Sequence, residues 1–397
     1  MLNDTHTLSV PTDYSRHEIP LGALELHWDV VVVGAGVAGA TAARLFAGSG
    51  RRTLLVDRSP SPRYKVCGSC LNARALGLLA ASGFDECLRL AGALPLREVR
   101  IATRNNFATL PLPGGLAVSR AVLDEMLARA AEESGAIFLP KTTAELGELP
   151  GASRIVWLRR GAERRSIETN LVLAADGLHG GLLQRAGENR MIVTKGSRVG
   201  LGTIVDGTGT DFEAGVIYMA CGEQGYAGVV RVEGGQLAIA AAVDPSELKR
   251  WEGPGALVAS LLEGAGFSAD LTQQAIWAGT PPLTRRASRF SAPRVLALGD
   301  ARGYVEPFTG EGMAWALESA HDAFDLVTIT PEVSSAELEQ AWELRARQQM
   351  TRRPVICRAI AGTLRSPRAT AILISILKVL PGLSGPFVSR MNAETRS

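Results

Sequence analysis

The stretch that decides the fold reads Asp29-Val-Val-Val-Val-Gly34-Ala-Gly36-Val-Ala-Gly39. Its first part is a continuous run of valines, and β-branched residues of this kind predict a buried strand. Small residues follow from Ala40 to Gly48 and favour a helix, and Thr53 to Val56 is a second apolar strand. A strand, a helix and a strand within about thirty residues predict a βαβ unit with a parallel pair of strands.

The three glycines of this stretch suit the binding of a dinucleotide. Gly34 permits a tight turn, Gly36 lets a pyrophosphate approach the backbone, and Gly39 lets the helix pack closely on the strand. The N-terminus of the helix offers free N–H groups and a partial positive charge to that pyrophosphate. Asp57 directly follows the second strand, where its carboxylate can accept hydrogen bonds from a ribose. Asp57 and its neighbour Arg58 are therefore predicted cofactor contacts.

A second glycine-rich segment lies near residue 300. It reads Gly299-Asp300-Ala-Arg-Gly303 and continues with Pro307-Phe-Thr-Gly310-Glu-Gly312. A short apolar strand precedes Asp300, so its carboxylate is predicted at a strand end, where it can bind the hydroxyls of a sugar-alcohol chain. The glycines open a long helix, whose N-terminus can offer N–H groups to an anionic ring system. The predicted cofactor contacts here are Asp300, Gly310 and Gly312.

The pattern changes between these two segments. Ile155 to Leu158 and Ser166 to Ala174 predict a β-hairpin that returns to the parallel sheet and ends at Asp176-Gly177. From Val199 to Val243, short β-rich pieces separated by turn residues predict an antiparallel sheet. The expected fold class is α/β, with a Rossmann-like domain, an inserted antiparallel-sheet domain and C-terminal helices. The predicted ranges are a flexible extension at 1–26, a nucleotide domain at 27–180 and 286–345, an antiparallel-sheet substrate domain at 181–285, and a basic helical segment at 346–397.

These segments together resemble a known superfamily. The fingerprint at Gly34 to Gly39, Asp176-Gly177 and the Gly299-Asp300 loop look like the FAD-binding set of the aromatic hydroxylases (group A flavoprotein monooxygenases) and geranylgeranyl reductases. The resemblance implies an FAD domain of glutathione-reductase type, in which the glycines bind the pyrophosphate and Asp57 the adenosine ribose. It also implies that Asp176 lies at the cofactor, that Asp300 binds the ribityl chain, that Arg120 contacts FAD, and that Pro307 to Gly312 lie against the isoalloxazine.

The branch within this superfamily decides the reaction. Gly303 stands where aromatic hydroxylases usually have a histidine, and Tyr64-Lys-Val-Cys67-Gly68-Ser-Cys70 looks like the segment that runs beside the flavin in the reductases. The resemblance therefore favours a reductase or dehydrogenase of a bulky hydrophobic substrate (prenyl, polyketide or aromatic), with NAD(P)H as electron donor and with Cys67, Gly68 and Pro307 near the reacting atoms. Two alternatives stay open, a monooxygenase that uses NAD(P)H and O2, and a non-catalytic prenyl-binding protein.

The two cysteines of this segment allow further interpretations. A zinc site needs four ligands, and the chain has no second Cys-x-x-Cys or pair of histidines at a usable spacing, so no metal is expected. A redox dithiol is possible, because the pair precedes a helix whose N-terminus would lower the pKa of a thiol. The simplest interpretation is that small residues let the chain approach the flavin closely.

The composition is that of a soluble globular protein, with 46% hydrophobic and 21% charged residues in a chain of 397. A net charge of +2 argues against nucleic-acid binding, but basic residues predominate from Arg345 onward. Five cysteines and no leader predict a cytoplasmic protein. The longest apolar run, Ala371 to Leu377, is too short to span a membrane. Beside cationic residues it predicts a helix that rests on the anionic inner face of the membrane, covers a lipid-sized cleft or packs on the acidic body.

Overall fold

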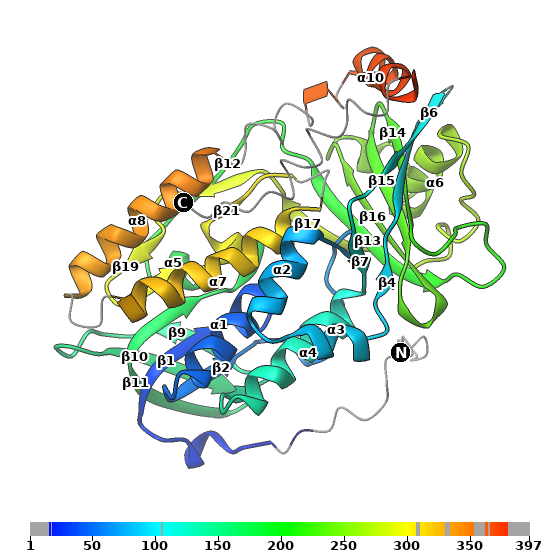
Figure 1. Ribbon diagram of the computed structural model, residues 1–397. Helices are drawn as coiled ribbons and strands as arrows, with labels where there is room; N and C mark the ends of the chain where they lie inside the picture. The colour runs from blue at the N-terminus through cyan, green and yellow to red at the C-terminus, as the bar shows by residue number, and fades with distance from the viewer. Residues whose placement is uncertain are drawn as a thin grey trace.

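The computed structural model describes residue 16, residues 18–104, 106–306, 310–329 and 334–352, residues 362 and 363, and residues 366–379. Two large sheets and two small ones make up this part of the chain, together with the helices that cover them (Figure 1). Segments from both halves of the sequence contribute to each large sheet, so the functional site depends on their assembly.

The first large sheet is built on the predicted βαβ unit. β1 pairs in parallel with β2 and with β11, and β11 pairs in parallel with β20. The strand order is β19-β20-β11-β1-β2-β8, and β10 and β9 continue antiparallel from β11. These strands are β1 (His27–Val33), β2 (Thr53–Val56), β8 (Ile137–Leu139), β9 (Thr143–Leu146), β10 (Arg154–Arg160), β11 (Glu163–Ala174), β19 (Ser291–Ala292) and β20 (Val295–Ala297).

Both faces of this sheet are covered by apolar groups. Val30 and Val32 of β1 face a core shared with the helices, whereas Val31 and Val33 face a second core under the β9–β11 strands. In the helical layer α1 packs against α4 and α7, because its alanines keep the helix surface flat. The helices in contact with these cores are α1 (Val37–Gly48), α2 (Ala73–Ala81), α3 (Asp85–Leu90), α4 (Arg120–Glu133), α5 (Gly181–Arg185), α7 (Gly312–Ile329) and α8 (Ser335–Arg352).

Residues 18–26 do not form the flexible extension that the sequence predicts. Leu21 and Leu24 are buried in the second core, and Leu21 opens a short 3-10 helix (η1, Leu21–Ala23). Arg16 pairs with Glu125 and Glu132 of α4, each at 2.8 Å. Isolated leucines in a polar stretch carry no periodicity, so the pattern could not reveal this docking. Residues 1–15 and 17 of the predicted extension lie outside the described residues.

The second large sheet is antiparallel apart from one pair of strands. Its order is β17-β13-β16-β15-β14-β5-β6, in which β14 and β5 run parallel with Val216 opposite Glu98. β5 and β6 come from within the range 27–180 that the sequence assigns to the nucleotide domain (Figure 1). α6 packs on the face that turns away from the first sheet. The elements are β5 (Glu98–Thr103), β6 (Asn106–Pro111), β13 (Val199–Asp206), β14 (Val216–Gly222), β15 (Gly225–Arg231), β16 (Gln236–Val243), α6 (Pro254–Gly264) and β17 (Ala278–Pro282).

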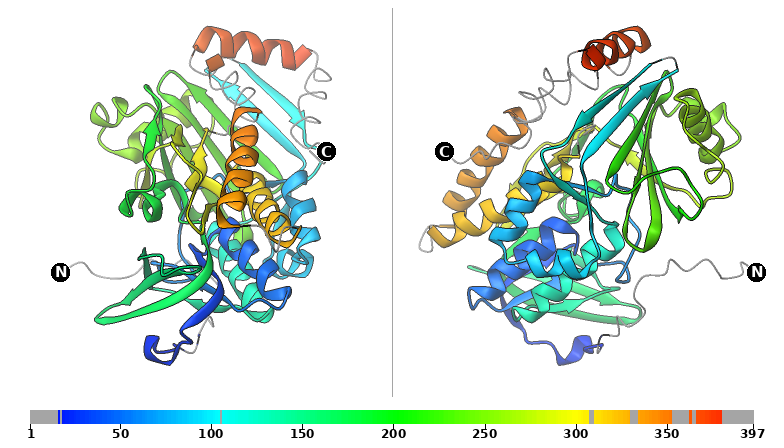
Figure 2. Two further views of the ribbon diagram at one scale, coloured as in Figure 1. Left: turned by 90° about the vertical axis from the view of Figure 1, so that its left-hand side faces the viewer. Right: turned by 45° about the vertical axis from the view of Figure 1, so that its right-hand side comes forward.

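Small sheets and two C-terminal helices complete the described structure. α8 packs beside β19 and β20, and α10 lies across β5 and β6 (Figure 2). No helix in the described ranges is both long and apolar enough to cross a membrane. The remaining elements are β3 (Cys70–Asn72), β4 (Leu94–Pro95), β7 (Gly115–Ala117), β12 (Met191–Val193), β18 (Arg285–Ala287), β21 (Gly303–Tyr304) and α10 (Pro367–Val379).

Candidate active site

The glycine loop between β1 and α1 combines close packing with open space. A Cβ atom on Gly39 would lie 1.8 Å from the carbonyl oxygen of Gly34, so only glycine fits at this position. A Cβ atom on Gly36 would meet nothing closer than Nη2 of Arg120 at 3.5 Å, and Gly36 borders a large cavity. Gly39 therefore shapes the turn, whereas Gly36 leaves room for an anion in front of the helix N-terminus.

Asp57 orders this loop from inside the protein. Its Oδ2 accepts a hydrogen bond from the backbone N–H of Ala35 at 2.8 Å, and its Oδ1 accepts one from Ser59 at 2.8 Å. The side chain is buried and does not border the cavity. In this structure the carboxylate thus holds the glycine loop, and its contact with a ribose stays a prediction.

Two other predicted cofactor contacts also lie away from the cavity lining. The guanidinium of Arg58 is exposed and lies 3.5 Å from Nδ1 of His179. Asp176 is directed toward α5, where its Oδ2 accepts a hydrogen bond from the N–H of Leu182 at 2.8 Å. Burial raises the pKa of Asp176, and hydrogen bonds from the backbone oppose that rise. Its nearest partner is therefore the start of a helix rather than the cavity.

Cationic side chains gather in front of the first glycine loop. Arg120 donates two hydrogen bonds of 2.8 Å to Asp124. Burial lowers the pKa of Arg120, whereas the neighbouring Asp124 carboxylate raises it. The upward effect is the larger, so the pKa of Arg120 lies above its usual value. Nζ of Lys65 would lie 4.0 Å from a Cβ on Gly36 and 3.5 Å from one on Gly177. Burial and the neighbouring Arg120 lower the pKa of Lys65, so a bound polyanion here would stabilise its charge.

The second glycine segment reaches the same cavity. β20 leads into a short 3-10 helix (η5, Gly299–Arg302), and Asp300 borders the cavity. Gly310 and Gly312 border it as well, and α7 begins at Gly312. Pro307 lies outside the described residues, so its position beside the reacting atoms stays a prediction. The structure thus brings both glycine segments to one space, although about 260 residues separate them in the chain.

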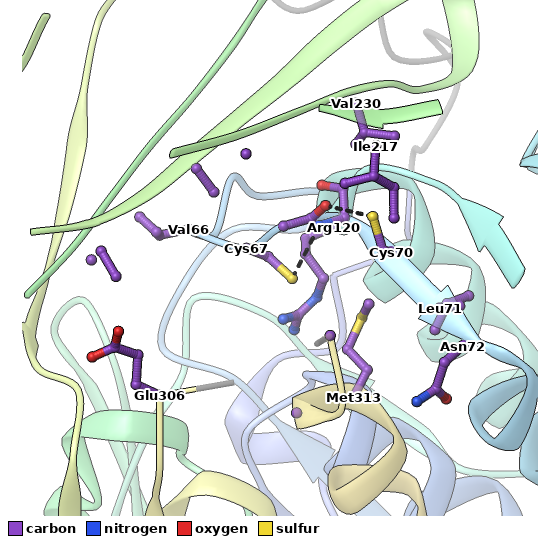
Figure 3. Close-up of a pocket in the computed structure, with 18 of the residues that line it drawn as sticks. Val66, Cys67, Cys70, Leu71, Asn72, Arg120, Ile217, Val230, Glu306 and Met313 are labelled. Carbon is purple, nitrogen blue, oxygen red and sulfur yellow. Dashed lines mark hydrogen bonds between the residues drawn. The ribbon is translucent and has the colours of Figure 1, made fainter. Parts of the chain in front are cut away.

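The cysteine segment forms one wall of that space. The N–H of Ser69 donates to Sγ of Cys67 at 3.4 Å, and Sγ of Cys70 donates to the carbonyl of Gly68 at 3.1 Å (Figure 3). Both cysteines are free thiols. Burial, together with the nearby Cys67, raises the pKa of Cys70, so its thiol stays protonated at neutral pH. All four residues border the cavity, as expected for a chain segment in close contact with a ligand.

The cavity continues from the glycine loops to the second sheet. Its volume is about 630 Å³. Figure 3 shows Cys67, Arg120 and Met313 around its centre, with Ile217 and Val230 of the second sheet above them. The part at the second sheet is apolar, and side chains of α10 contribute to its lining. The apolar lining includes Leu96, Val99, Ile101, Leu110, Leu112, Ile217, Met219, Val230, Leu373, Ile376 and Leu377.

The residues around the glycine loops fit FAD. The open backbone at Gly36 and the cations Lys65 and Arg120 suit a pyrophosphate, and the start of α7 suits a ring that becomes anionic on reduction. Asn72 borders the cavity, and its Oδ1 caps α2. Its buried Nδ2 has no hydrogen-bond partner among the residues that the structure describes. A ligand with acceptor atoms would satisfy that donor. Lys65 and Asn72 were not predicted from the sequence, because no spacing pattern marks them.

Comparisons with known proteins agree with this site. Residues 27–341 match a family model described as an FAD binding domain. A digeranylgeranylglycerophospholipid reductase of Picrophilus torridus is 26% identical over 349 residues, which cover 83% of this chain and 85% of that protein. A menaquinone reductase of Mycolicibacterium smegmatis is 26% identical over 389 residues, which cover 86% of this chain and 85% of that protein.

Solved structures share the fold at lower identity. A flavin-dependent brominase superposes with a TM-score of 0.78 at 15% identity, over 92% of this chain and 93% of that chain. A geranylgeranyl bacteriochlorophyll reductase-like protein of Thermoplasma acidophilum superposes with a TM-score of 0.73 at 20% identity, over 93% of this chain and 96% of that chain. These likenesses show the fold alone. They agree with the predicted fold class. The family match over most of the chain confirms the predicted cofactor: the chain belongs to the FAD-binding-domain family and is an FAD-dependent oxidoreductase.

Proposed function

We propose that this protein reduces carbon–carbon double bonds in the prenyl chain of a lipid. The observation that carries the proposal is the continuity of the cavity, which joins the FAD loops to a chamber lined by aliphatic side chains. FAD, when bound and reduced by NAD(P)H, would supply the hydride. The chain's own residues bind and orient a long apolar substrate and exclude water, because a lining of leucine, isoleucine and valine favours such a chain over solvent.

Two observations favour a reductase over a monooxygenase. The two relatives that align with 83% and 86% of this chain are named digeranylgeranylglycerophospholipid reductase and menaquinone reductase. Gly303 has φ near +132°, and a Cβ atom there would lie 2.8 Å from the carbonyl oxygen of Arg285. The position therefore resists any side chain, including the histidine usual in the aromatic hydroxylases. We further propose NAD(P)H as the electron donor, and Cys67 and Gly68 as the wall nearest the reacting part of FAD.

Anaerobic reduction tests the proposed reaction. The FAD-loaded protein is expected to be bleached by NADPH or NADH and reoxidised by a lipid with unsaturated prenyl groups, giving a product two mass units heavier per double bond reduced. Flavin absorbance and mass spectrometry of the lipid measure the two steps. A product heavier by one oxygen, formed only when O2 is admitted, would instead establish the monooxygenase. Retention of the lipid without any chemistry would establish the prenyl-binding protein.

We also propose that α10 rests on a membrane surface. Leu373, Ile376 and Leu377 border the cavity, whereas Ile372 and Val379 are 61% and 76% exposed on the same helix. Basic Arg368 and Lys378 are exposed on this helix too. Apolar and cationic side chains side by side suit the interface of an anionic bilayer. Such contact would place the wall of the cavity directly against the lipid phase.

Acidic substitutions on the outer face of α10 test this contact. Replacing both Ile372 and Val379 by glutamate is expected to weaken binding to phosphatidylcholine–phosphatidylglycerol vesicles by at least about tenfold, since each buried aliphatic side chain contributes roughly 1.5–3 kcal/mol. Vesicle sedimentation measures the affinity. Ile276→Glu is the matched control, because Ile276 is 82% exposed just before β17 and should leave vesicle binding unchanged. Equal sedimentation of the double variant and the unaltered protein would refute the proposed contact.

A further inference from the structure

One polar cluster lies in the wall of the cavity among mainly apolar side chains of the second sheet. Glu306 and Tyr226 both border the cavity, and the hydroxyl of Tyr226 is hydrogen-bonded to the Glu306 carboxylate. Figure 3 shows Glu306 on the opposite side of the labelled residues from Leu71 and Asn72. The cluster is therefore separate from the wall that carries the unsatisfied Asn72 donor.

A buried arginine holds this carboxylate from behind. Arg198 is fully buried, and its Nη1 lies 3.3 Å from Oε1 of Glu306, which is only 2% exposed. The Nε atom of Arg198 lies 3.6 Å from Oδ1 of Asp244, and its guanidinium lies 5.6 Å from the centre of the Tyr226 ring. Removing an arginine and a carboxylate from water costs several kcal/mol, so the pair needs such compensation to persist.

The chemistry of the cluster defines what it can bind. A carboxylate has about four acceptor positions, and Arg198 and Tyr226 occupy two of those of Glu306. Burial and the Glu306 carboxylate raise the pKa of Tyr226 well above its usual value, so its hydroxyl stays protonated. The remaining positions of Glu306 accept hydrogen bonds from a ligand, and the Tyr226 oxygen can accept one as well.

The charge of the cluster excludes an anionic group. Arg198 contributes one positive charge, whereas Glu306 and Asp244 contribute two negative charges. A phosphate placed against Glu306 would meet the carboxylate oxygens at close range, where like charges repel strongly in an apolar cavity. A neutral hydroxyl placed there would donate a hydrogen bond to Glu306 or to the Tyr226 oxygen. Leaving such an acceptor without a partner in an apolar cavity costs free energy.

We propose that Glu306 and Tyr226 form a hydroxyl-binding subsite, through which the enzyme selects lipids with a phenol-type head group over lipids with a phosphate head group. This inference rests on the proposed function, because it names the head group of the same lipid substrate. Arg198 is a positioning residue that holds the Glu306 carboxylate at the wall of the cavity.

Three probes that share the same farnesyl tail test the subsite: 4-farnesylphenol, its methyl ether and farnesyl monophosphate. They are titrated into the full-length FAD-loaded protein under anaerobic conditions, and the change in flavin absorbance reports binding. The phenol is expected to bind about tenfold more tightly than the ether, because a site built around a hydroxyl penalises its absence. The monophosphate is expected to bind more weakly than the ether. Equal affinity for phenol and ether, or preference for the monophosphate, would overturn the subsite.

Conservative variants assign the effect to these side chains. Tyr226→Phe should reduce the preference for the phenol over the ether to about threefold or less, because one hydrogen-bonding group is lost. Glu306→Gln keeps the shape, removes the charge and should strengthen binding of the monophosphate. Tyr218→Phe is the matched control on the neighbouring strand, since Tyr218 packs in the core under α6 and does not border the cavity.

The outcomes separate this inference from the proposed function. A Tyr226→Phe variant with the full preference for the phenol would disprove the subsite even if Glu306→Gln failed to fold. Turnover of a prenyl lipid without any preference for the hydroxyl would disprove the subsite and leave the reductase intact. Selective binding of the phenol without reduction of any double bond would support the subsite and refute the reductase.

Discussion

Gly36→Ala is expected to weaken FAD binding by about 100-fold, or ~2.8 kcal/mol, while the apoprotein stays folded. Apart from its two chain neighbours, the described residues have no atom closer than 3.5 Å to the added methyl group, so the fold itself accepts it. It would, however, occupy the space in front of the α1 N-terminus, where the pyrophosphate has to reach the backbone N–H groups. Calorimetric titration of the apoprotein with FAD and its thermal unfolding measure the two effects separately.

Two other glycines of the same helix serve as references for this result. Gly48→Ala should leave FAD affinity unchanged, because a Cβ at Gly48 meets nothing within 4 Å. Gly39→Ala should prevent folding, since its Cβ would lie 1.8 Å from the carbonyl oxygen of Gly34. If Gly36→Ala bound FAD as tightly as the unaltered protein, the pyrophosphate would not lie at this loop.

Arg120→Leu is expected to lower the free energy of unfolding of the apoprotein by about 3–5 kcal/mol, because it leaves a buried carboxylate without its partner. The side chains of Arg120 and Asp124 are only 7% and 5% exposed, and the guanidinium donates two hydrogen bonds to that carboxylate. Urea denaturation followed by circular dichroism measures the loss. The double variant Arg120→Leu with Asp124→Leu should recover a large part of it, since no unpaired charge remains buried.

An ion pair of the same spacing, in which the arginine is exposed, provides the comparison. Arg347 is 65% exposed and pairs with Glu343 of α8, so Arg347→Leu should change stability by no more than about 0.5 kcal/mol. Similar losses from Arg120→Leu and Arg347→Leu would show that burial of the Arg120 pair has no energetic consequence. The Arg120 variant should also bind FAD less tightly, because its guanidinium borders the cavity beside Gly36.

Local patterns in the sequence determined the parts of this protein that fold as short-range units. The valine run, the glycine loop and the following helix appear at the predicted positions, because β-branched residues, glycines and alanines act over a few neighbouring residues. The second glycine segment was predicted for the same reason, and α7 begins at Gly312. These two loops, with the rule that strand ends meet at one edge of a parallel sheet, predicted a nucleotide cofactor. The resemblance of both loops and Asp176-Gly177 to a known superfamily then implied that this cofactor is FAD.

Contacts between distant segments decided the rest. The parallel pairing of β5 with β14 joins Glu98 to Val216, and no local pattern distinguishes that partner from another apolar strand. The same assembly places Tyr226, Glu306 and Arg198 in one cluster and brings α10 over the cavity. Hydrophobic burial is non-directional, so the sequence identifies which residues are apolar, whereas only the packed structure shows which of them line the chamber and which charged groups face it.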